Sequence, residues 1–181
     1  MLRRELLSIL GQAAAVSVLA PLAPEERLGW GRRLHASLVE HPGMVALDRA
    51  RSALVAELAD LILPRTDTPG ANDVRVVEFI DRILAFWDTA EERDRFLAGL
   101  DAIQARAGSG GLVALSPEQQ TTLLSALDNA ENPAGGSAEE AWARLKSMVV
   151  YGYFTSKEVQ QTVLKTVILP GRYDGCVPAG G

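Results

Sequence analysis

The sequence predicts an all-α protein: a compact, irregular bundle of about five to six helices, followed by an extended Gly/Pro-rich C-terminal tail. Apolar residues recur at spacings of three and four along most of the chain, which places them on one face of a helix. Apart from Thr166–Leu169, no stretch has the character of a β-strand. Short polar breaks rich in Gly and Pro separate the periodic segments, as is typical of helical bundles.

Residues 1–23 are expected to be a twin-arginine-type export signal or an N-terminal helix. Arg3 and Arg4 precede residues 6–20, which carry no charge but are fewer than the ~20 apolar residues needed to span a bilayer. A positive start, a short apolar run and paired arginines favour export of a folded protein. An ordinary amphipathic first helix remains the alternative, and residues 24–47 are expected to be a linker or an additional segment.

The helical domain is predicted over residues 48–168. Its first helix runs from about Asp48 to Leu63, where Pro64 and the turn-forming residues up to Gly70 end it. Five residues are expected on the buried face of this helix: Leu54, Val55, Leu58, Leu61 and Ile62. A second periodic stretch, from Val74 to about Phe86, predicts the next helix.

Capping patterns mark the later helices. Thr89, Ser116 and Ser137 each lie three residues before Glu or Gln, which is the pattern of a helix N-terminus. The helices that follow carry apolar residues at helical spacing: Phe96, Leu97, Leu100 and Ile103 in the third, Leu123, Leu124 and Leu127 in the fourth, and Trp142, Leu145, Met148, Val149 and Tyr153 in the fifth. Thr155 or Ser156 begins a short sixth helix, and Leu112–Leu115 is expected to be a loop.

Composition and charge exclude several classes of function. Of the 181 residues, 48% are apolar and 23% charged, which is the balance of one globular domain. The net charge is -5, and residues 36–136 hold eight Lys or Arg against sixteen Asp or Glu. Such a surface repels phosphate backbones, so we expect no nucleic-acid partner.

The sequence offers no set of residues suited to catalysis or metal binding. His35 and His41 lack the spacing of a helical ligand pair, so we expect two solvated imidazoles. Gly108–Gly111 follows a predicted helix rather than a strand, unlike a nucleotide-binding turn. Four carboxylates are expected on solvent-facing sides of helices: Glu57, Asp60, Glu78 and Asp81. We therefore predict no catalytic residue, metal or cofactor in this chain.

Residues 169–181 are predicted to form an extended partner-binding tail with two prolines, four glycines and Cys176. As the lone cysteine of the chain, Cys176 has no intramolecular disulfide partner. In an oxidising compartment it is either a free thiol or part of an intermolecular disulfide. Arg172 and Tyr173, with Tyr153 and Phe154, are candidate partner-binding residues because aromatic and arginine side chains are favoured at interfaces.

Several segments resemble, in the same order, the gluconate 2-dehydrogenase subunit 3 family. The segments are Leu58–Pro64, Asp67–Ala71, Val77–Asp81, Phe96–Leu100, Leu115–Gln119, Gly152–Ser156 and Pro170–Cys176. Together they span residues 58–176, whereas Leu28–Val45 does not match the family pattern. The resemblance implies a small accessory subunit of a periplasmic, membrane-associated sugar, polyol or sugar-acid dehydrogenase.

The resemblance also implies where the redox chemistry lies. The catalytic partner is expected to be a flavoprotein of the glucose-methanol-choline type that carries FAD, and a cytochrome c subunit with haem c often accompanies it. This chain is then expected to assist folding, export and assembly, and to meet the membrane only through the complex. An alternative from another class is a free-standing exported helical binding protein with a pocket among Trp30, Trp87 and Trp142.

Overall fold

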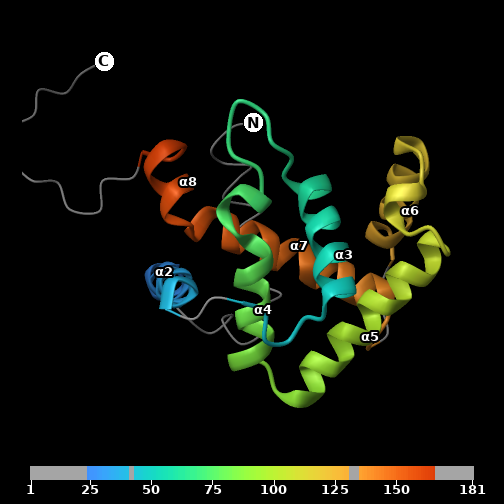
Figure 1. Ribbon diagram of the computed structural model, residues 1–181, viewed down its shortest axis with the longest axis horizontal. Helices are drawn as coiled ribbons and strands as arrows, with labels where there is room; N and C mark the ends of the chain where they lie inside the picture. Colours follow the sequence, from blue (N-terminus) through green and yellow to red (C-terminus); the bar gives the residue numbers. More distant parts are fainter. Residues whose placement is uncertain (1–23, 41–42, 131–134, 166–181) are drawn as a thin grey trace, which may run out of the picture.

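The computed structural model describes residues 24–40, 43–130 and 135–165, and within them every regular element is helical (Figure 1). The elements are α2 (Pro24–Glu40), α3 (Arg49–Ile62), a 3₁₀ turn η1 (Asn72–Val74), α4 (Val76–Phe86), α5 (Ala90–Ala107), a 3₁₀ turn η2 (Leu112–Ala114), α6 (Pro117–Asp128), α7 (Ala138–Thr155) and α8 (Lys157–Thr162). The all-α prediction is confirmed. The predicted tail, the segment Thr166–Leu169 and the N-terminal 23 residues lie outside the described part.

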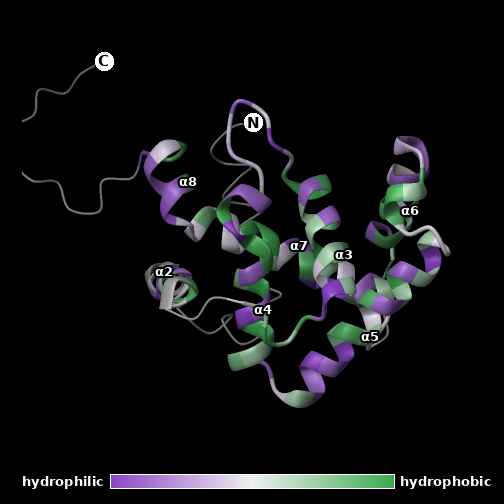
Figure 2. Ribbon diagram, viewed as in Figure 1, coloured by the Kyte–Doolittle hydropathy of each residue, from purple (hydrophilic) through white to green (hydrophobic). Residues whose placement is uncertain are grey.

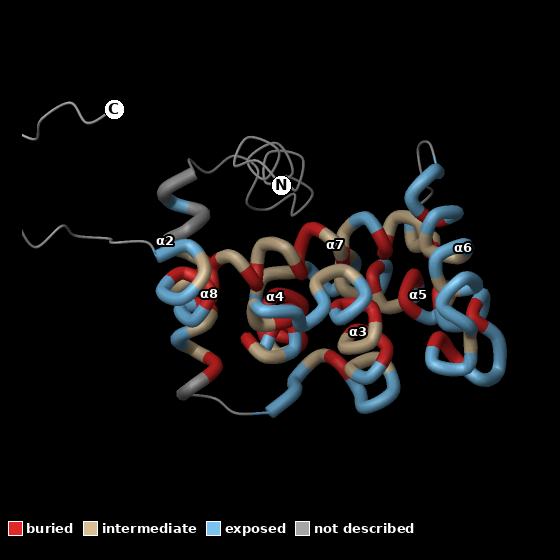
Figure 3. The backbone as a smooth tube through the Cα atoms, turned by 90° about the horizontal axis from the view of Figure 1, so that it is seen from above, coloured by how far each residue is buried: buried red, intermediate tan, exposed pale blue. Residues whose placement is uncertain are grey.

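Helix α7 is the centre of the bundle, because it packs against each of the other described α-helices. Leu145, Met148 and Val149 of this helix are fully buried. Figure 3 shows buried residues along α7 and along the neighbouring α4. Figure 2 shows that α3, α4 and α5 each carry both hydrophobic and hydrophilic residues, as helices with one buried face do.

The predicted helix starts are confirmed by their hydrogen bonds. Thr89 and Ser116 each form a complete capping box, with Glu92 and Gln119 respectively. The Ser137 hydroxyl accepts a hydrogen bond from the Glu140 N–H. Caps of this kind contribute about 1 kcal/mol each, because they satisfy backbone N–H groups that have no partner inside the helix.

Helix α2 was not predicted, and it lies within the segment expected to be a linker. It buries Leu34 and Leu38 and packs against α4 and α7. Gly29 and Gly31 weaken its helical pattern in the sequence. Packing explains why position 31 is a glycine, since a Cβ atom there would lie 2.5 Å from the Thr155 side chain.

Two other details differ from the sequence expectation. Residues 112–114 form the turn η2, and Leu112 is buried with its carbonyl accepting a hydrogen bond from Gln120 at 2.8 Å. Leu61 is 42% exposed rather than buried, because it lies at the end of α3. In the described part of the chain, no helix is long and apolar enough to cross a membrane.

Candidate functional site

Two of the predicted partner-binding residues, Tyr153 and Phe154, lie near the end of α7. Tyr153 is buried, and its hydroxyl donates a hydrogen bond to the Pro69 carbonyl at 2.7 Å. The ring of Phe154 is half-buried and packs edge-on against Tyr153, with ring centroids 5.1 Å apart. Both side chains thus make contacts within the chain, and their role in binding a partner stays a prediction.

The turn that Tyr153 contacts is held by several bonds of its own. The Ala71 N–H donates to the Leu63 carbonyl at 2.9 Å, and the Gly70 N–H donates to the Asp73 carboxylate at 2.8 Å. Asp73 also pairs with Arg65, and this pairing is the main reason that the pKa of Asp73 is lowered. The fold therefore joins two of the recognised segments, Asp67–Ala71 and Gly152–Ser156, into one corner beside the start of α8.

The remaining predicted site residues lie outside the part of the chain that the structure describes. They are Arg3 and Arg4 of the expected signal, and Arg172, Tyr173 and Cys176 of the expected tail. Their roles, including the intermolecular disulfide, stay predictions.

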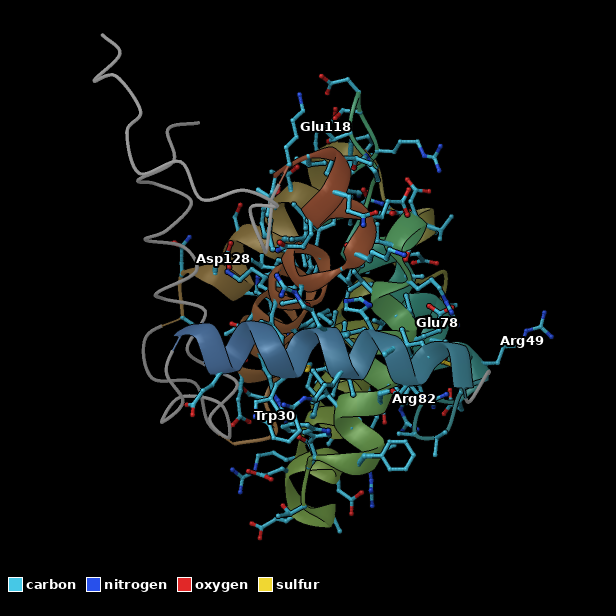
Figure 4. All side chains as sticks on the ribbon, turned by 90° about the vertical axis from the view of Figure 1, so that its left-hand side faces the viewer. Trp30, Arg49, Glu78, Arg82, Glu118 and Asp128 are labelled. Carbon is cyan, nitrogen blue, oxygen red and sulfur yellow. The ribbon has the colours of Figure 1, made fainter. Side chains whose placement is uncertain are left out.

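Asp81 is completely buried, which corrects the expectation that it faces solvent. Its carboxylate accepts hydrogen bonds from the backbone N–H groups of Val45, Ala46 and Leu47, each at 2.8 Å. It also accepts one from Arg82 at 3.1 Å. Arg82, which is labelled in Figure 4, in turn donates to the Gly43 carbonyl at 2.9 Å. Together these groups form what we call the Asp81 clamp, which fixes loop 43–47 on α4.

A sequence signal for the buried position of Asp81 did exist. Asp81 lies four residues after Val77 and three before Leu84, so it shares the apolar face of α4 with both. We expected Asp81 at the surface because it is charged, and charged side chains are rarely buried without a partner. The partners come from residues 43–47, a segment without helical periodicity.

Three large apolar side chains near the Asp81 clamp are exposed to solvent. Met44, Val45 and Phe86 are 41%, 61% and 67% exposed, which makes them half of the large exposed hydrophobic residues in the described part of the chain. The Arg82 guanidinium lies between loop 43–47 and the end of α4, since it bonds to the Gly43 carbonyl and lies 5.9 Å from the centre of the Phe86 ring. This apolar surface is a candidate contact region.

His35 is also placed differently from the expectation of a solvated imidazole. It is partly buried between α2, α4 and α7, with its Nε2 atom 2.7 Å from the Gly152 carbonyl. Its ring stacks on Phe79 with centroids 4.6 Å apart. Burial is the main reason that the pKa of His35 is lowered, and the charge of Arg75 lowers it further. His41 lies outside the described residues.

Among the described residues, Trp30 and Trp87 are not part of the lining of the cleft beside Trp142. Trp30 and Trp87 pack edge-to-face, with centroids 4.6 Å apart, between α2 and α4. Trp142 lies instead beside an open cleft between α3, α6 and α7, where its Nε1 atom donates to Asp128 at 2.7 Å. The cleft is lined by Leu61, Ile62, Pro117, Gln120, Thr121, Leu124, Ser125, Asp128, Trp142 and Lys146.

Comparison with known proteins assigns the family of this chain. Neither the curated proteins nor the solved structures that were compared with it gave a match. The family model of gluconate 2-dehydrogenase subunit 3 matches residues 49–171, which include α3 to α8 and the corner formed by the turn and the end of α7. This match covers more than half of the chain, so the protein belongs to the gluconate 2-dehydrogenase subunit 3 family.

Proposed function

We propose that this chain is the non-catalytic small subunit of an FAD-dependent dehydrogenase complex that oxidises a sugar, a polyol or a sugar acid. Membership of the family carries the proposal, because the family is described as one subunit of gluconate 2-dehydrogenase. The catalytic partner would be a flavoprotein of the glucose-methanol-choline type. The small subunit would assist its folding, export and assembly.

In the described part of the chain, the glycine-rich segment 108–111 is poorly placed to hold FAD. A dinucleotide site uses glycines at a turn from a strand into a helix, where the helix N-terminus faces the phosphates. Gly108–Gly111 lies instead between the end of α5 and the turn η2. We therefore assign FAD to the partner flavoprotein, and haem c, where present, to a third subunit.

The apolar surface beside the Asp81 clamp supports a role in assembly. Interfaces bury apolar and aromatic side chains at their centre, and Met44, Val45 and Phe86 are available for this. A loop fixed by a buried carboxylate also loses little conformational entropy on binding. The predicted tail with Cys176 would add a second point of attachment and raise the effective concentration of the partner.

Co-purification from the native host tests the assignment. A tagged small subunit is expected to bring down a flavoprotein whose visible spectrum shows bound flavin, and deleting the small subunit is expected to reduce both dehydrogenase activity and export. Recovery of the chain alone, together with unchanged activity and export in the deletion strain, would contradict the proposal. Flavin binding and sugar oxidation by the isolated chain would contradict it as well.

Export through the twin-arginine route is the proposed path to the periplasm, and the paired arginines allow a direct test. Replacing Arg3 and Arg4 together by lysine keeps the charge but removes the arginine pair that is read as an export signal. The variant complex is expected to stay in the cytoplasmic fraction. Normal appearance of the variant in the periplasm would show that this pair is not the signal.

A further inference from the structure

Helix α2 lies outside the residues that the family model matches. The family match begins at residue 49, whereas α2 ends at Glu40. Figure 4 shows α2 crossing in front of α4, and its contacts are with α4 and α7. Trp30 packs against Trp87, and Leu34 and Leu38 are buried. The helix therefore covers apolar surface that the family domain would otherwise expose.

The contact between α2 and the domain is close where the two helices cross. Gly31 lies directly over Thr155, and a Cβ atom at Gly152 would lie 2.7 Å from the Phe79 ring. Because these two residues have no side chain, α2 can approach α7 at Gly31, and α7 can approach α4 at Gly152. His35, one turn after Gly31, lies where the three helices meet, and it stacks on Phe79 of α4 and bonds to the Gly152 carbonyl of α7.

Burial lowers the pKa of His35 more than the hydrogen bond to the Gly152 carbonyl raises it, and the charge of Arg75 lowers it further. Arg75, at the start of α4, has a charge that acts on His35, and this guanidinium pairs with Glu78 at 3.1 Å. On α7, the neighbouring Gly152 is a carbonyl acceptor and Thr155 a hydroxyl that bonds to the Tyr151 carbonyl. The ring of Tyr151, also on α7, contacts Phe79 edge-on, with centroids 5.6 Å apart.

On α2 itself, the charged residues near His35 are cationic. Arg32 lies one turn before it and Arg33 lies over the Trp30 ring, 4.9 Å from its centre. A proton on His35 would place positive charge in a partly buried site on which the charge of Arg75 already acts. A neutral imidazole protonated on Nε2 also donates the hydrogen bond to Gly152, but an imidazolium donates it more strongly, so this bond by itself raises the pKa of His35.

We propose that α2 is a pH-sensitive cover, which stays docked while His35 is neutral and is released from α4 and α7 when His35 is protonated. Release would expose the aromatic surface of Phe79 and Trp87 on the family domain. The inference does not depend on the function proposed above, since it concerns contacts within this chain.

The direction of the pH dependence follows from the preference of the docked state for the neutral ring. In the released state the pKa of His35 returns to its usual value of about 6.5. Docking is therefore strongest above that pH and weakens as the pH falls through and below it. Because a single proton is involved, the docking equilibrium changes by at most about tenfold per pH unit.

Hydrogen exchange of the full chain tests this proposal between pH 7.5 and 5. After correction for the chemical exchange rate, opening of α2 amides is expected to rise several-fold toward pH 5 while α5 and α7 stay protected. His35→Gln keeps a hydrogen-bond donor but does not titrate, so its α2 opening should be independent of pH. His41→Gln is the matched control, because the chain has only two histidines, and should behave like the parent protein.

A second measurement uses the unmodified sequence, so the test does not depend on how the variants fold. The imidazole resonance of His35, followed by NMR in histidine-labelled protein, is expected to titrate over the same pH range as α2 opening. Constant α2 protection across the range would overturn the proposal. So would titration of His35 without release of α2, or an unchanged pH response in His35→Gln.

Discussion

Replacing Asp81 by alanine should destabilise the protein more than the same replacement of any surface carboxylate. The substitution leaves three backbone N–H groups and the Arg82 guanidinium without their common acceptor. Hydrogen bonds to a charged group contribute about 1.5–3 kcal/mol each, but their sum overstates the loss because loop 43–47 can move and meet water. Breaking a buried ion pair by removing one partner costs about 3–5 kcal/mol, and we expect a loss in that range.

Urea unfolding of Asp81→Ala measures this loss, with Asp60→Ala as the matched control. Asp60 lies exposed on α3, so its replacement should change the free energy of unfolding by less than about 0.5 kcal/mol. Adding Arg82→Met to Asp81→Ala should cost less than the sum of the two single changes, since both remove the same contact between Arg82 and Asp81. A loss below about 1 kcal/mol for Asp81→Ala would refute the account of the Asp81 clamp.

Three further predictions follow from burial and from the tail. Leu58→Ala should lower the free energy of unfolding in urea by about 2–5 kcal/mol, because Leu58 is fully buried. Leu61 is exposed on the same helix, so Leu61→Ala should lower it by less than about 1 kcal/mol. Equal losses would show that the buried face of α3 is misassigned. Arg144→Met removes the cation that donates to both oxygens of the buried Asp88 at 2.6 Å. Burial raises the pKa of Asp88 even with Arg144 present, and loss of the cation raises it further, so this carboxyl takes up a proton at a pH above its usual pKa of 3.8. Protonation removes the charge that the variant leaves without its cation, so the variant should lose less stability at pH 4 than at pH 7, and a larger loss at pH 4 would be the contrary result. Cys176→Ser should abolish a covalent band with the partner in non-reducing electrophoresis, and persistence of that band would exclude the disulfide.

Local signals determined the helix boundaries. Asp48, Thr89, Ser116 and Ser137 cap the helices that their positions predicted, because the side-chain oxygen of a cap bonds to backbone N–H groups two or three residues away. The pattern of apolar residues likewise identified the buried sides of α5 and α7. These interactions span only a few residues, so they can be read from the sequence.

The assignments that failed involve contacts between distant parts of the chain. Asp81 meets residues 43–47 only because the loop folds back over α4, and His35 meets Gly152 across 117 positions of sequence. No local pattern reports such contacts, and a charged or titratable residue considered alone is expected at the surface. The structure therefore decided which polar residues are buried.

By itself, the sequence determined the all-α class, the capped helix starts and the family, since each depends on local spacing or on motifs in a fixed order. Only the tertiary structure decided that α2 covers α4 and α7, and that loop 43–47 is fixed by Asp81. The physical reason is that the burial of a glycine, a histidine or an aspartate depends on contacts with other segments of the chain. In this protein those contacts are the close approach of Thr155 to Gly31, the Gly152 carbonyl beside His35 and the backbone N–H groups that bond to Asp81.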